Sequence, residues 1–419
     1  NIAMDGAKSS GACGCDALST GQTLLSVKNA VALSLKGLTR IPKTEWLDLA
    51  QLNGRVLAKD ILAPNAMPSF TNAAMDGFAV RISDLPQDRS LPVAGTVAAG
   101  DVPGVLPAGA ALRIFTGAPV PKGANTVVMV EHCQDYGQNV RIAADPTIGQ
   151  NIRLAGSDQH QGQLIIRVGT RISAHHVGLL AANGITGATV VTRPRVAIFS
   201  TGDELRSGEC NPGQIHDANR PMLCQLIQQA GAKTSDLGIL PDNPRATTEI
   251  FEHARDRYDL IVTSGAVSMG GCDFIRSAFR SAGGEITGWR IALKPGKPVA
   301  FGHLGRTMFT GLPGNPFAAF VGYYLFVRAQ LEQLTGQRLK PFASVPARAA
   351  FDWACRPERA EAFPVRCIGY DNSGLPLLDR LGNGVSATLL PLANADGLAF
   401  VPAGTGHVKP DERLNWHPF

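Results

Sequence analysis

The chain is poor in charged residues, which make up 17% of its 419 residues, against about 25% in an average globular protein. Hydrophobic residues nevertheless make up 44%. This share excludes a disordered chain, because disorder requires low hydrophobicity together with a high net charge. The glycines have no three-residue period, which excludes collagen. At about 150 residues per domain, the length predicts roughly three globular domains.

The sequence also lacks the features of secreted, membrane and nucleic-acid-binding proteins. The longest apolar run, around residues 318–327, is about half of the roughly 20 residues that cross a bilayer. We expect no signal peptide, and the eight cysteines lack the spacing of a disulfide framework. No block of Lys and Arg reaches five residues, so we expect neither nucleic acid nor membrane as a partner. The net charge of +5 suits small anionic substrates or ordinary solubility, and the expected location is cytoplasmic.

Glycine and proline are abundant instead, with 46 and 28 residues, or about 18% of the chain against a typical share of roughly 12%. In residues 65–156 they separate short apolar runs about every eight to twelve residues, a spacing typical of an all-β domain. Residues 341–419 have the same character and predict a second, smaller β-domain. The expected strands are residues 91–97, 112–115, 126–130, 387–392 and 398–401.

Outside these domains, apolar residues recur at the spacing of one helix face and predict further helices. They lie near residues 24–35, 45–57 and 174–183. Residues 1–22 are small and polar and predict a flexible N-terminal tail.

Residues 193–335 alternate between buried-strand runs and helical patterns, which predicts a parallel, doubly wound sheet. Asn219 can cap the first helix of this region. Pro244 and Pro316 suit the first positions of two later helices, where the missing N–H of proline has no cost. The expected strands are residues 195–199, 237–240, 258–263 and 307–310, and another helix is expected near residues 273–281.

Four polar loops follow the expected strands, at residues 200–204, 241–244, 264–273 and 311–316. Ligands of parallel sheets bind outside the carboxyl ends of the strands, so we expect these loops to share one site. Loop 264–273 is rich in glycine and precedes a helix, so its N–H groups can cradle a phosphate. A plain strand–helix turn is the alternative for this loop. No Gly-x4-Gly-Lys-Ser/Thr motif occurs, so it is not a Walker A loop.

Carboxylates occur in three of these loops. Magnesium binds oxygen, usually from one or two carboxylates together with phosphate and water. Each aspartate alone is also a good helix N-cap, and Asp273 can both cap its helix and bind metal. Three such loops at one edge favour a metal or acid–base site. The candidates are Asp203, Glu204, Asp242 and Asp273.

Lys294 and Lys297 lie in the segment Lys-Pro-Gly-Lys-Pro, in which two prolines fix the backbone φ. A lysine acts as a point charge toward phosphate or another oxyanion. Lysine pairs are usually solvated, but the stiff segment favours a positioned pair that binds an anion. The histidines, including His175 and His176, have no metal-ligand spacing and are interpreted as structural or surface residues.

Several segments together resemble the molybdopterin molybdenumtransferase family, which includes bacterial MoeA, the gephyrin E domain and the plant homologue. Residues 75–80, Met-Asp-Gly-Phe-Ala-Val, resemble the family signature Met-Asp-Gly-Tyr-Ala-Val. The resemblance runs from about Leu24 to the C-terminus and is weakest after residue 341. Further matching blocks are residues 115–121, 200–205, 294–298 and 311–316.

The resemblance implies a multidomain α/β plus β protein. Its parts are a central doubly wound α/β domain of the molybdopterin-binding type, a β-rich inserted domain, a mixed discontinuous domain and a C-terminal β-barrel. The implied boundaries are a flexible tail at 1–22, domain I at 23–64 and 157–192, domain II at 65–156, domain III at 193–340 and domain IV at 341–419.

The same resemblance implies an enzyme of molybdenum cofactor biosynthesis. It inserts molybdate into the dithiolene of adenylylated molybdopterin with release of AMP, and it requires magnesium. The family forms a homodimer with an intersubunit active site, and molybdopterin adenylyltransferase supplies the substrate upstream. The catalytic residues that the family motifs imply are Asp76, Thr116, Asp158, Glu204, Asp242 and Asp273, of which the last three are metal ligands. The implied substrate-binding residues are Ser264, Gly265, Lys294, Lys297, Pro313, Gly314, Asn315, Pro316, Arg366 and Ser386.

The sequence departs from the family pattern at three motif positions, which are Ser157, Ala266 and Phe78. These departures concern the rate or the ligand geometry more than the class of protein. Two other functions are alternatives. The family dimer can serve as an anchoring scaffold with weak or lost catalysis, although the retained acidic residues Glu204, Asp242 and Asp273 favour the enzyme. A generic phosphotransfer or nucleotide-sugar enzyme is disfavoured, because a dinucleotide fingerprint is absent.

Overall fold

A computed structural model describes residues 24–240, 243–265, 267 and 272–419, with the backbone alone for Cys272 and Asp273. The predicted tail, Asp242 and most of loop 264–273 therefore lie outside the described residues. The contacts divide the chain into two compact units. The larger unit contains residues 54–56 and 191–419 together with the segment that ends at Glu45, and the smaller contains residues 46–53 and 57–190.

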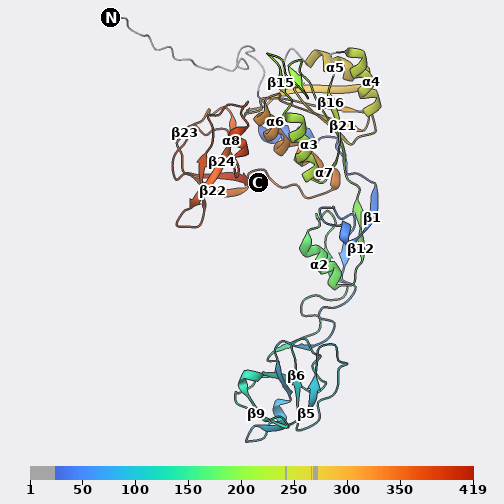
Figure 1. Cartoon of the computed structure of the whole chain (residues 1–419), viewed down its shortest axis with the longest axis vertical. Coiled ribbons are helices and arrows are strands. Elements are labelled where there is room, and N and C mark those ends of the chain that lie inside the picture. The colour runs from blue at the N-terminus through green and yellow to red at the C-terminus, as the bar shows by residue number, and fades with distance from the viewer. Residues whose placement is uncertain (1–23, 241–242, 266, 268–271) are drawn as a thin grey trace, which may run out of the picture. The chain divides into compact units, whose positions relative to one another are not determined.

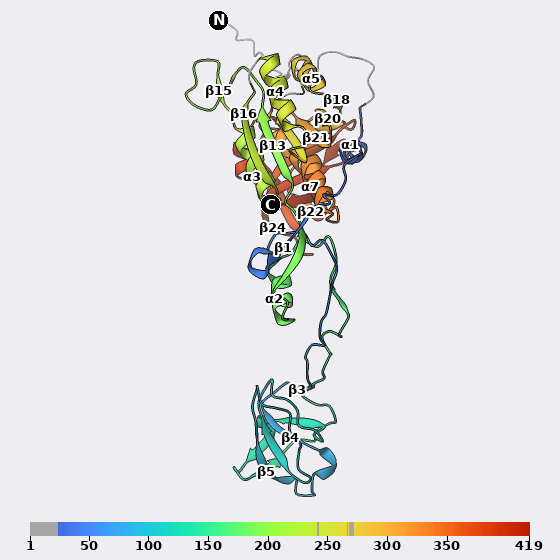
Figure 2. The same ribbon diagram turned by 90° about the vertical axis from the view of Figure 1, so that its right-hand side faces the viewer.

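The larger unit is built on a six-stranded sheet, whose strands are shown side by side in Figure 2. The order is β16 (Lys233–Ile239), β13 (Arg195–Ser200), β17 (Leu260–Ser264), β21 (Thr307–Leu312), β20 (Pro298–Leu304) and β18 (Gly284–Arg290). Neighbours among the first four strands are parallel, as predicted. Strands β20 and β18 add an antiparallel edge that the sequence analysis did not anticipate. Strand β20 begins at Pro298, and a proline in the sequence usually indicates a turn. The first residue of a strand is nevertheless a position where proline is accepted.

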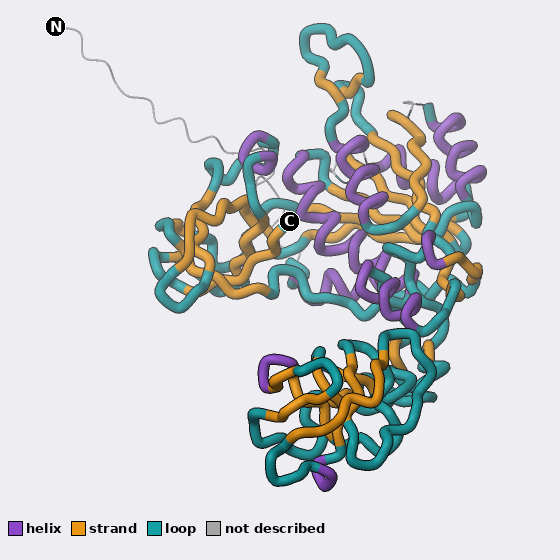
Figure 3. The backbone as a smooth tube through the Cα atoms, turned by 60° about the horizontal axis from the view of Figure 1, so that its bottom comes forward, coloured by secondary structure: helices purple, strands orange, loops and turns teal. Residues whose placement is uncertain are grey.

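Helices cover both faces of this sheet (Figures 1 and 3). On one face, Phe251 and Phe279 of two helices join Phe199 and Phe309 of the strands in one buried aromatic cluster. Tertiary packing of this kind supplies most of the stability of such short helices. The helices of that face are α4 (Pro244–Ala254) and α5 (Cys272–Ser281). The other helices of this α/β part are α1 (Val27–Leu35), α3 (Asn219–Gln229), α6 (Pro316–Gly322), the π-helical η5 (Tyr323–Val327) and α7 (Arg328–Thr335).

The ends of two of these helices show why the sequence folds this way. Pro244 and Pro316 occupy first-turn positions of α4 and α6, as predicted. Asn243 caps α4, because its side chain accepts hydrogen bonds from the N–H groups of Arg245 and Ala246. The expectation for Asn219 is wrong, since Ala218 is the N-cap of α3 and Asn219 lies within the helix. Its amide is used elsewhere, as described below.

The C-terminal part of the larger unit is a closed five-stranded β-barrel, as the fold-class prediction implies. Phe363 and Trp416 lie in its core. The expected strand at residues 387–392 is wrong, because this segment holds the short helix α8 (Leu390–Ala393), in which Pro391 takes a first-turn position. The barrel order is β24 (Ala360–Tyr370), β25 (Pro376–Arg380), β22 (Val345–Ala349), β28 (Arg413–Pro418) and β26 (Gly397–Val401), which pairs again with β24.

Short strands complete this unit. Strand β19 (Leu293–Lys294) follows β18 and runs parallel to the start of β24. The other short pairs are β14 (Leu205–Arg206) with β15 (Ile215–His216), and β23 (Trp353–Ala354) with β27 (His407–Val408).

The smaller unit is rich in β-structure, as predicted for most of its length. One sheet has six strands, β7 (Thr126–Met129), β4 (Gly77–Val80), β6 (Ala111–Ile114), β5 (Ser90–Val97), β9 (Asn139–Ile142) and β8 (Cys133–Asp135). Short pairs are β3 (Asn72–Ala73) with β10 (Ile152–Arg153), β2 (Ile61–Leu62) with β11 (Leu164–Ile166), and β1 (Thr44–Asp48) with β12 (Gly187–Val191). The remaining elements are α2 (Ala174–Ala182), η2 (Leu49–Gln51), η3 (Ile82–Asp84) and η4 (Val130–His132).

The helix expected at residues 45–57 is wrong. This segment forms β1 and the single 3-10 turn η2 instead. Strand pairing with β12 overrides a weak helical pattern, because propensity is a weak prior against tertiary contacts. Gly54, with a φ of +77°, then ends the local structure in a conformation that favours glycine.

Candidate functional site

Ser200, Ser264 and Leu312 form one row at the carboxyl end of the parallel sheet. Ser264 of β17 is paired with Ser200 of β13 and with Leu312 of β21. Ser200 is also paired with Ile239 of β16. Because these four strands are parallel, with one register shift between β13 and β16 just before Ser200, the loops that follow them start at one edge, as the sequence predicts.

The hydroxyl of Ser264 joins two of these loops. It donates a hydrogen bond to the carbonyl oxygen of Pro313 at 3.3 Å and accepts one from Nδ2 of Asn219 at 2.6 Å. Nδ2 of Asn219 also donates to the carbonyl oxygen of Gly314 at 2.6 Å. Ser264 is only 3% exposed, so its hydroxyl serves the contact between the loops that follow β17 and β21.

Gly265 brings the same loop close to a third one. Its φ is +99°, and a Cβ atom here would lie 2.4 Å from the carbonyl oxygen of Thr201. Only glycine fits this approach and this conformation without strain. Its N–H donates to the carbonyl oxygen of Leu312 at 3.1 Å, which ties the loop to β21.

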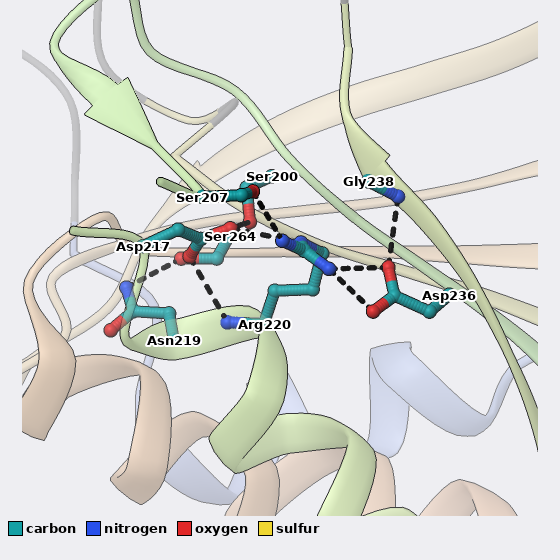
Figure 4. A network of polar contacts seen from close by, with 8 residues as sticks. All are labelled: Ser200, Ser207, Asp217, Asn219, Arg220, Asp236, Gly238 and Ser264. Atoms are coloured by element: carbon teal, nitrogen blue, oxygen red, sulfur yellow. Dashed lines mark hydrogen bonds and ion pairs between the residues drawn. The ribbon is translucent and has the colours of Figure 1, made fainter. Parts of the chain in front are cut away.

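A charged network lies at the start of α3 (Figure 4). Oδ2 of Asp217 accepts hydrogen bonds from the Ser200 hydroxyl at 2.6 Å and from Nε of Arg220 at 2.9 Å. The guanidinium of Arg220 also donates to both carboxylate oxygens of Asp236 and to the hydroxyl of Ser207. The network therefore links α3 to Ser200, the last residue of β13, and to Asp236 in the middle of β16.

Two of the three charges of this network lie in a largely dry environment, while the side chain of Asp236 is 49% exposed. The side chain of Asp217 is 2% exposed and that of Arg220 is 11% exposed. Burial lowers the pKa of Arg220, but hydrogen bonds to Asp236 and Asp217 outweigh burial and raise it above its usual value. The guanidinium is therefore a permanent cation that two carboxylates fix in place.

Lys294, one of the two candidate anion-binding lysines, is held by the barrel. Its ammonium nitrogen lies 3.2 Å from Oε1 of Glu361 and 5.5 Å from the ring centre of Trp353. The indole N–H of Trp353 donates to the same carboxylate oxygen at 3.1 Å. Cζ of Arg380 also lies over the ring of Trp353, 3.3 Å from its centroid, so the lysine lies beside a cationic and aromatic cluster. Lys297 is half-buried in the same segment.

Asn315 and Ser386 connect the loop after β21 to the barrel. Nδ2 of Asn315 donates to the Ser386 hydroxyl at 2.7 Å, and the N–H of Phe317 donates to the Ser386 carbonyl oxygen at 3.1 Å. Pro316 is half-buried at the start of α6. The second barrel candidate, Arg366, is exposed on β24 and donates to the carbonyl oxygen of Asn394 at 3.5 Å.

The candidate metal ligands are described only in part. The carboxylate of Glu204 is exposed and lies over Gly202, where a Cβ atom would meet Oε2 at 2.8 Å. Asp242 lies outside the described residues, and so does the side chain of Asp273. Within the described residues, no cluster of three metal-ligating side chains is formed. The exposed oxygen donor of Glu204, at an edge where two further acidic loops begin, fits magnesium, which prefers oxygen ligands and retains water.

The smaller unit carries the other candidate catalytic residues. Oδ1 of Asp76 accepts hydrogen bonds from the N–H of Thr116 at 2.7 Å and from its hydroxyl at 2.8 Å. These two bonds, the backbone one first, lower the pKa of Asp76. Asp158 is exposed, and its N–H donates to the carbonyl oxygen of Met67 at 2.9 Å. The structure thus brings Asp76 and Thr116 together in a hydrogen-bonded pair that favours the ionised form of Asp76.

Reasoning from sequence missed several residues at the carboxyl edge and in the barrel. Nothing in the pattern distinguished Glu361, Trp353 or Arg380, whose partners are remote in sequence. Asp217 and Arg220 had a usable signal, since they flank Asn219 at the start of a helix that follows a strand. The segment Asp-Ala-Asn-Arg at residues 217–220 carries both charge signs on either side of that amide.

Three family models match the chain in order. Residues 25–184 match the MoeA N-terminal region (domain I and II), residues 197–333 match a probable molybdopterin binding domain, and residues 346–419 match the MoeA C-terminal region (domain IV). The molybdopterin molybdenumtransferase of Haemophilus influenzae is 38% identical over 319 residues, which are 75% of this chain and 79% of that protein. That of Bacillus subtilis is 31% identical over 379 residues, 87% of each chain.

The solved structure of the molybdopterin biosynthesis moeA protein from Pyrococcus horikoshii OT3 has the same fold. It covers 95% of this chain and 100% of its own, with a TM-score of 0.79 and 27% sequence identity. Fold and site thus define a multidomain α/β protein with a domain of the molybdopterin-binding type and a C-terminal barrel. The chain belongs to the molybdopterin molybdenumtransferase family, a family of enzymes in molybdenum cofactor biosynthesis. Among the described residues, no helix is long and apolar enough to span a membrane.

Proposed function

We propose that this enzyme inserts molybdate into the dithiolene of adenylylated molybdopterin and releases AMP, and that it requires magnesium. The observation that carries the proposal is the row of Ser200, Ser264 and Leu312, from which the acidic, glycine-rich and proline-containing loops start at one edge. The family membership supports the same reaction. Both substrates are anionic, so their approach requires positive charge and N–H donors at this edge.

The residues divide into groups with different tasks. Glu204, Asp242 and Asp273 hold magnesium, which neutralises pyrophosphate charge when it is bound and favours cleavage of the pyrophosphate bond. Gly265 offers its loop backbone to the phosphates, and Lys294 presents a cation that Glu361 keeps in position. The remaining residues proposed to bind the substrate are Ser264, Lys297, Pro313, Gly314, Asn315, Pro316, Arg366 and Ser386.

Asp76, Thr116 and Asp158 complete the site from a second subunit in this proposal. They lie in the smaller unit, and the hydrogen bonds from Thr116 keep Asp76 ionised and fixed in direction. The enzyme is then a cytoplasmic homodimer, and molybdopterin adenylyltransferase supplies its substrate. The four-domain boundaries given above stay a prediction.

The reaction is tested by supplying purified protein with adenylylated molybdopterin, molybdate and magnesium, and by measuring AMP. We expect AMP release, and we expect Asp242→Asn or Asp273→Asn to lower its rate by roughly 100-fold. Glu252→Gln, on an exposed position of α4, is the matched control and leaves the rate unchanged. Full activity of both asparagine variants means that the metal assignment is wrong.

A scaffold of the same fold with weak or lost catalysis is the second candidate. It is favoured if the unaltered protein binds the substrate but releases no AMP. The intersubunit site has its own test, in which inactive Asp76→Asn and Asp273→Asn proteins are mixed and allowed to exchange subunits. Mixed dimers regain one intact site each, so activity returns; no recovery would mean that both residues act within one subunit.

A further inference from the structure

One polar segment contacts Ser200 of β13, Ser264 of β17 and Asp236 of β16 (Figure 4), and it also contacts Gly314 in the loop after β21. It consists of Asp217, Asn219 and Arg220, which lie just before and within the first turn of α3. The family motifs considered above assign no role to these residues. Their partners fall into two separate groups, one contacted by Asn219 and the other by the Asp217–Arg220 pair.

Asn219 holds the first group, formed by β17 and the loop after β21. Its Nδ2 donates to the Ser264 hydroxyl and to the carbonyl oxygen of Gly314, each at 2.6 Å. The residue is 6% exposed. A carbonyl oxygen only accepts hydrogen bonds, so the N–H side of the amide must face Gly314 and the orientation of Asn219 is fixed.

This arrangement destabilises the fold in a way that an apolar residue at the same position of α3 would not. Oδ1 of Asn219 is buried and has no hydrogen-bond partner in the described part of the chain. A buried acceptor without a partner destabilises the fold. A leucine or alanine would avoid this cost, so what the asparagine contributes is the pair of donors that connects two loops.

The Asp217–Arg220 pair holds the second group, formed by β13 and β16. Asp217 accepts from the hydroxyl of Ser200, the last residue of β13. Arg220 bridges Asp217 to Asp236, which also accepts from the N–H of Gly238 on β16 at 2.9 Å. One guanidinium thereby connects the end of β13 to the middle of β16 through hydrogen bonds to two carboxylates.

We propose that Asn219 and the Asp217–Arg220 pair are positioning residues that set the relative placement of the parallel strands and of the loop residues next to them for the molybdenumtransferase reaction. Asn219 sets Ser264 at the end of β17 relative to Gly314 in the loop after β21, and Arg220 sets Ser207 in the loop after β13 relative to Asp236 of β16. Because the two residues are consecutive in one helical turn, the spacing between the two groups is fixed by the helix. The kinetic part of this inference rests on the proposed function, and the structural part does not.

The structural part is tested by hydrogen exchange at two backbone amides, each of which reports on one group. The N–H of Gly265 donates to Leu312 at 3.1 Å, and the N–H of Leu240 donates to Ser200 at 2.9 Å. We expect Asn219→Ala to speed exchange at Gly265 by about tenfold and to leave Leu240 unchanged. Arg220→Met should have the opposite pattern.

Matched variants keep this test decisive. Gln228→Ala lies on the same helix, where Gln228 donates to the hydroxyl of Thr234, and it should change neither amide. If Arg220→Met does not fold because Asp217 is left unpaired, Arg220→Lys keeps the charge but loses the fork that reaches both carboxylates. Asn219→Ser keeps one hydrogen-bond donor and replaces Asn219→Ala if that variant does not fold. Faster exchange at both amides, or at neither, in the Asn219 and Arg220 variants overturns the proposal.

The kinetic part uses AMP release by the intact protein. We expect Asn219→Ala to raise KM for adenylylated molybdopterin by about tenfold, and Arg220→Met or Arg220→Lys to lower kcat by about tenfold, because each displaces different loops. A role in folding alone would leave KM unchanged in Asn219→Ala and would leave kcat per folded molecule, with folded protein measured by circular dichroism, unchanged in the Arg220 variants. Either result would overturn the proposal. If the unaltered protein releases no AMP, the proposed function fails, and the exchange pattern still decides the positioning role.

Discussion

The ammonium group of Lys294 lies 3.2 Å from Oε1 of Glu361, so a carboxylate of the barrel holds a lysine that reaches it from the α/β part. The two residues are paired in register between β19 and β24. The side chain of Glu361 is 5% exposed and that of Lys294 is 34% exposed. The barrel therefore decides where the candidate substrate-binding cation lies.

Glu361→Gln should destabilise the protein, because it leaves a half-buried ammonium without its counter-charge. We expect the free energy of unfolding to fall by about 2 kcal/mol, less than for a fully buried pair because water reaches Lys294. Urea unfolding measures this change. The control is Glu249→Gln, which breaks the exposed pair of Glu249 with Arg245 and should cost under about 0.5 kcal/mol. Equal effects of the two substitutions would contradict the prediction.

Gly265→Ala should distort the loop after β17. The added Cβ would lie 2.4 Å from the carbonyl oxygen of Thr201, at a φ of +99°, so we expect a loss of about 2 kcal/mol in the free energy of unfolding. Gly314→Ala is the matched control, because its Cβ would meet only Cα of Gly265 at 3.5 Å. Thermal unfolding of both variants checks the difference. A Gly265→Ala protein as stable as the control would show that the loop shifts freely.

Thr116→Val should raise the pKa of Asp76 without restoring its ordinary value. The backbone N–H of residue 116 is the larger cause of the lowered pKa and remains, while the hydroxyl hydrogen bond is lost. A lowered carboxyl pKa favours the folded state above the ordinary titration range, and this contribution is lost as pH falls through the folded-state value. A carboxyl NMR titration measures the shift. No change in the pKa would mean that the hydroxyl does not bond Asp76 in solution.

His417 should make the barrel sensitive to mild acid. Burial, with a smaller effect of Arg328, lowers its pKa from 6.5 to about 4. The unfolded chain therefore takes up a proton below pH 6.5 while the folded protein resists until about pH 4. The free energy of unfolding should fall across this window and then level off.

His417→Phe tests this prediction, because phenylalanine keeps the ring contact with Tyr324, which lies 4.8 Å away between centroids. Urea unfolding at several pH values should give a flatter profile between pH 6.5 and about 4 than in the unaltered protein. An identical slope in both proteins would assign the acid sensitivity to other groups.

Much of the fold could be predicted because the signals are local. Buried-strand runs predicted β13 and β17, and Pro244 and Pro316 predicted two helix starts. Parallel topology then led from four strands to one edge, which the register of Ser200 and Ser264 confirms. The errors arise where tertiary contacts outweigh a local signal. Residues 45–57 have a weak helical pattern, but pairing with β12 makes part of this segment a strand.

The sequence predicted which loops form the candidate site, but it did not predict which groups their side chains contact. The loops at residues 200–204 and 311–316 start at the edge where the sequence predicts them. The tasks of individual side chains were less accessible, because polar groups in a folded core take whatever partners the fold brings near. Ser264, expected to face a ligand, uses its hydroxyl toward Pro313 and Asn219.

The sequence by itself determined the four parallel strands of residues 193–335, the family and the edge of the sheet where the polar loops start, because these follow from local periodicity and motif spacing. Only the tertiary structure decided which residues form hydrogen bonds with those loops. Asn219, a plausible cap from its position, binds Ser264 and Gly314, which are 45 and 95 residues away. A buried amide must find partners inside the protein, and only the folded chain brings such distant donors and acceptors together.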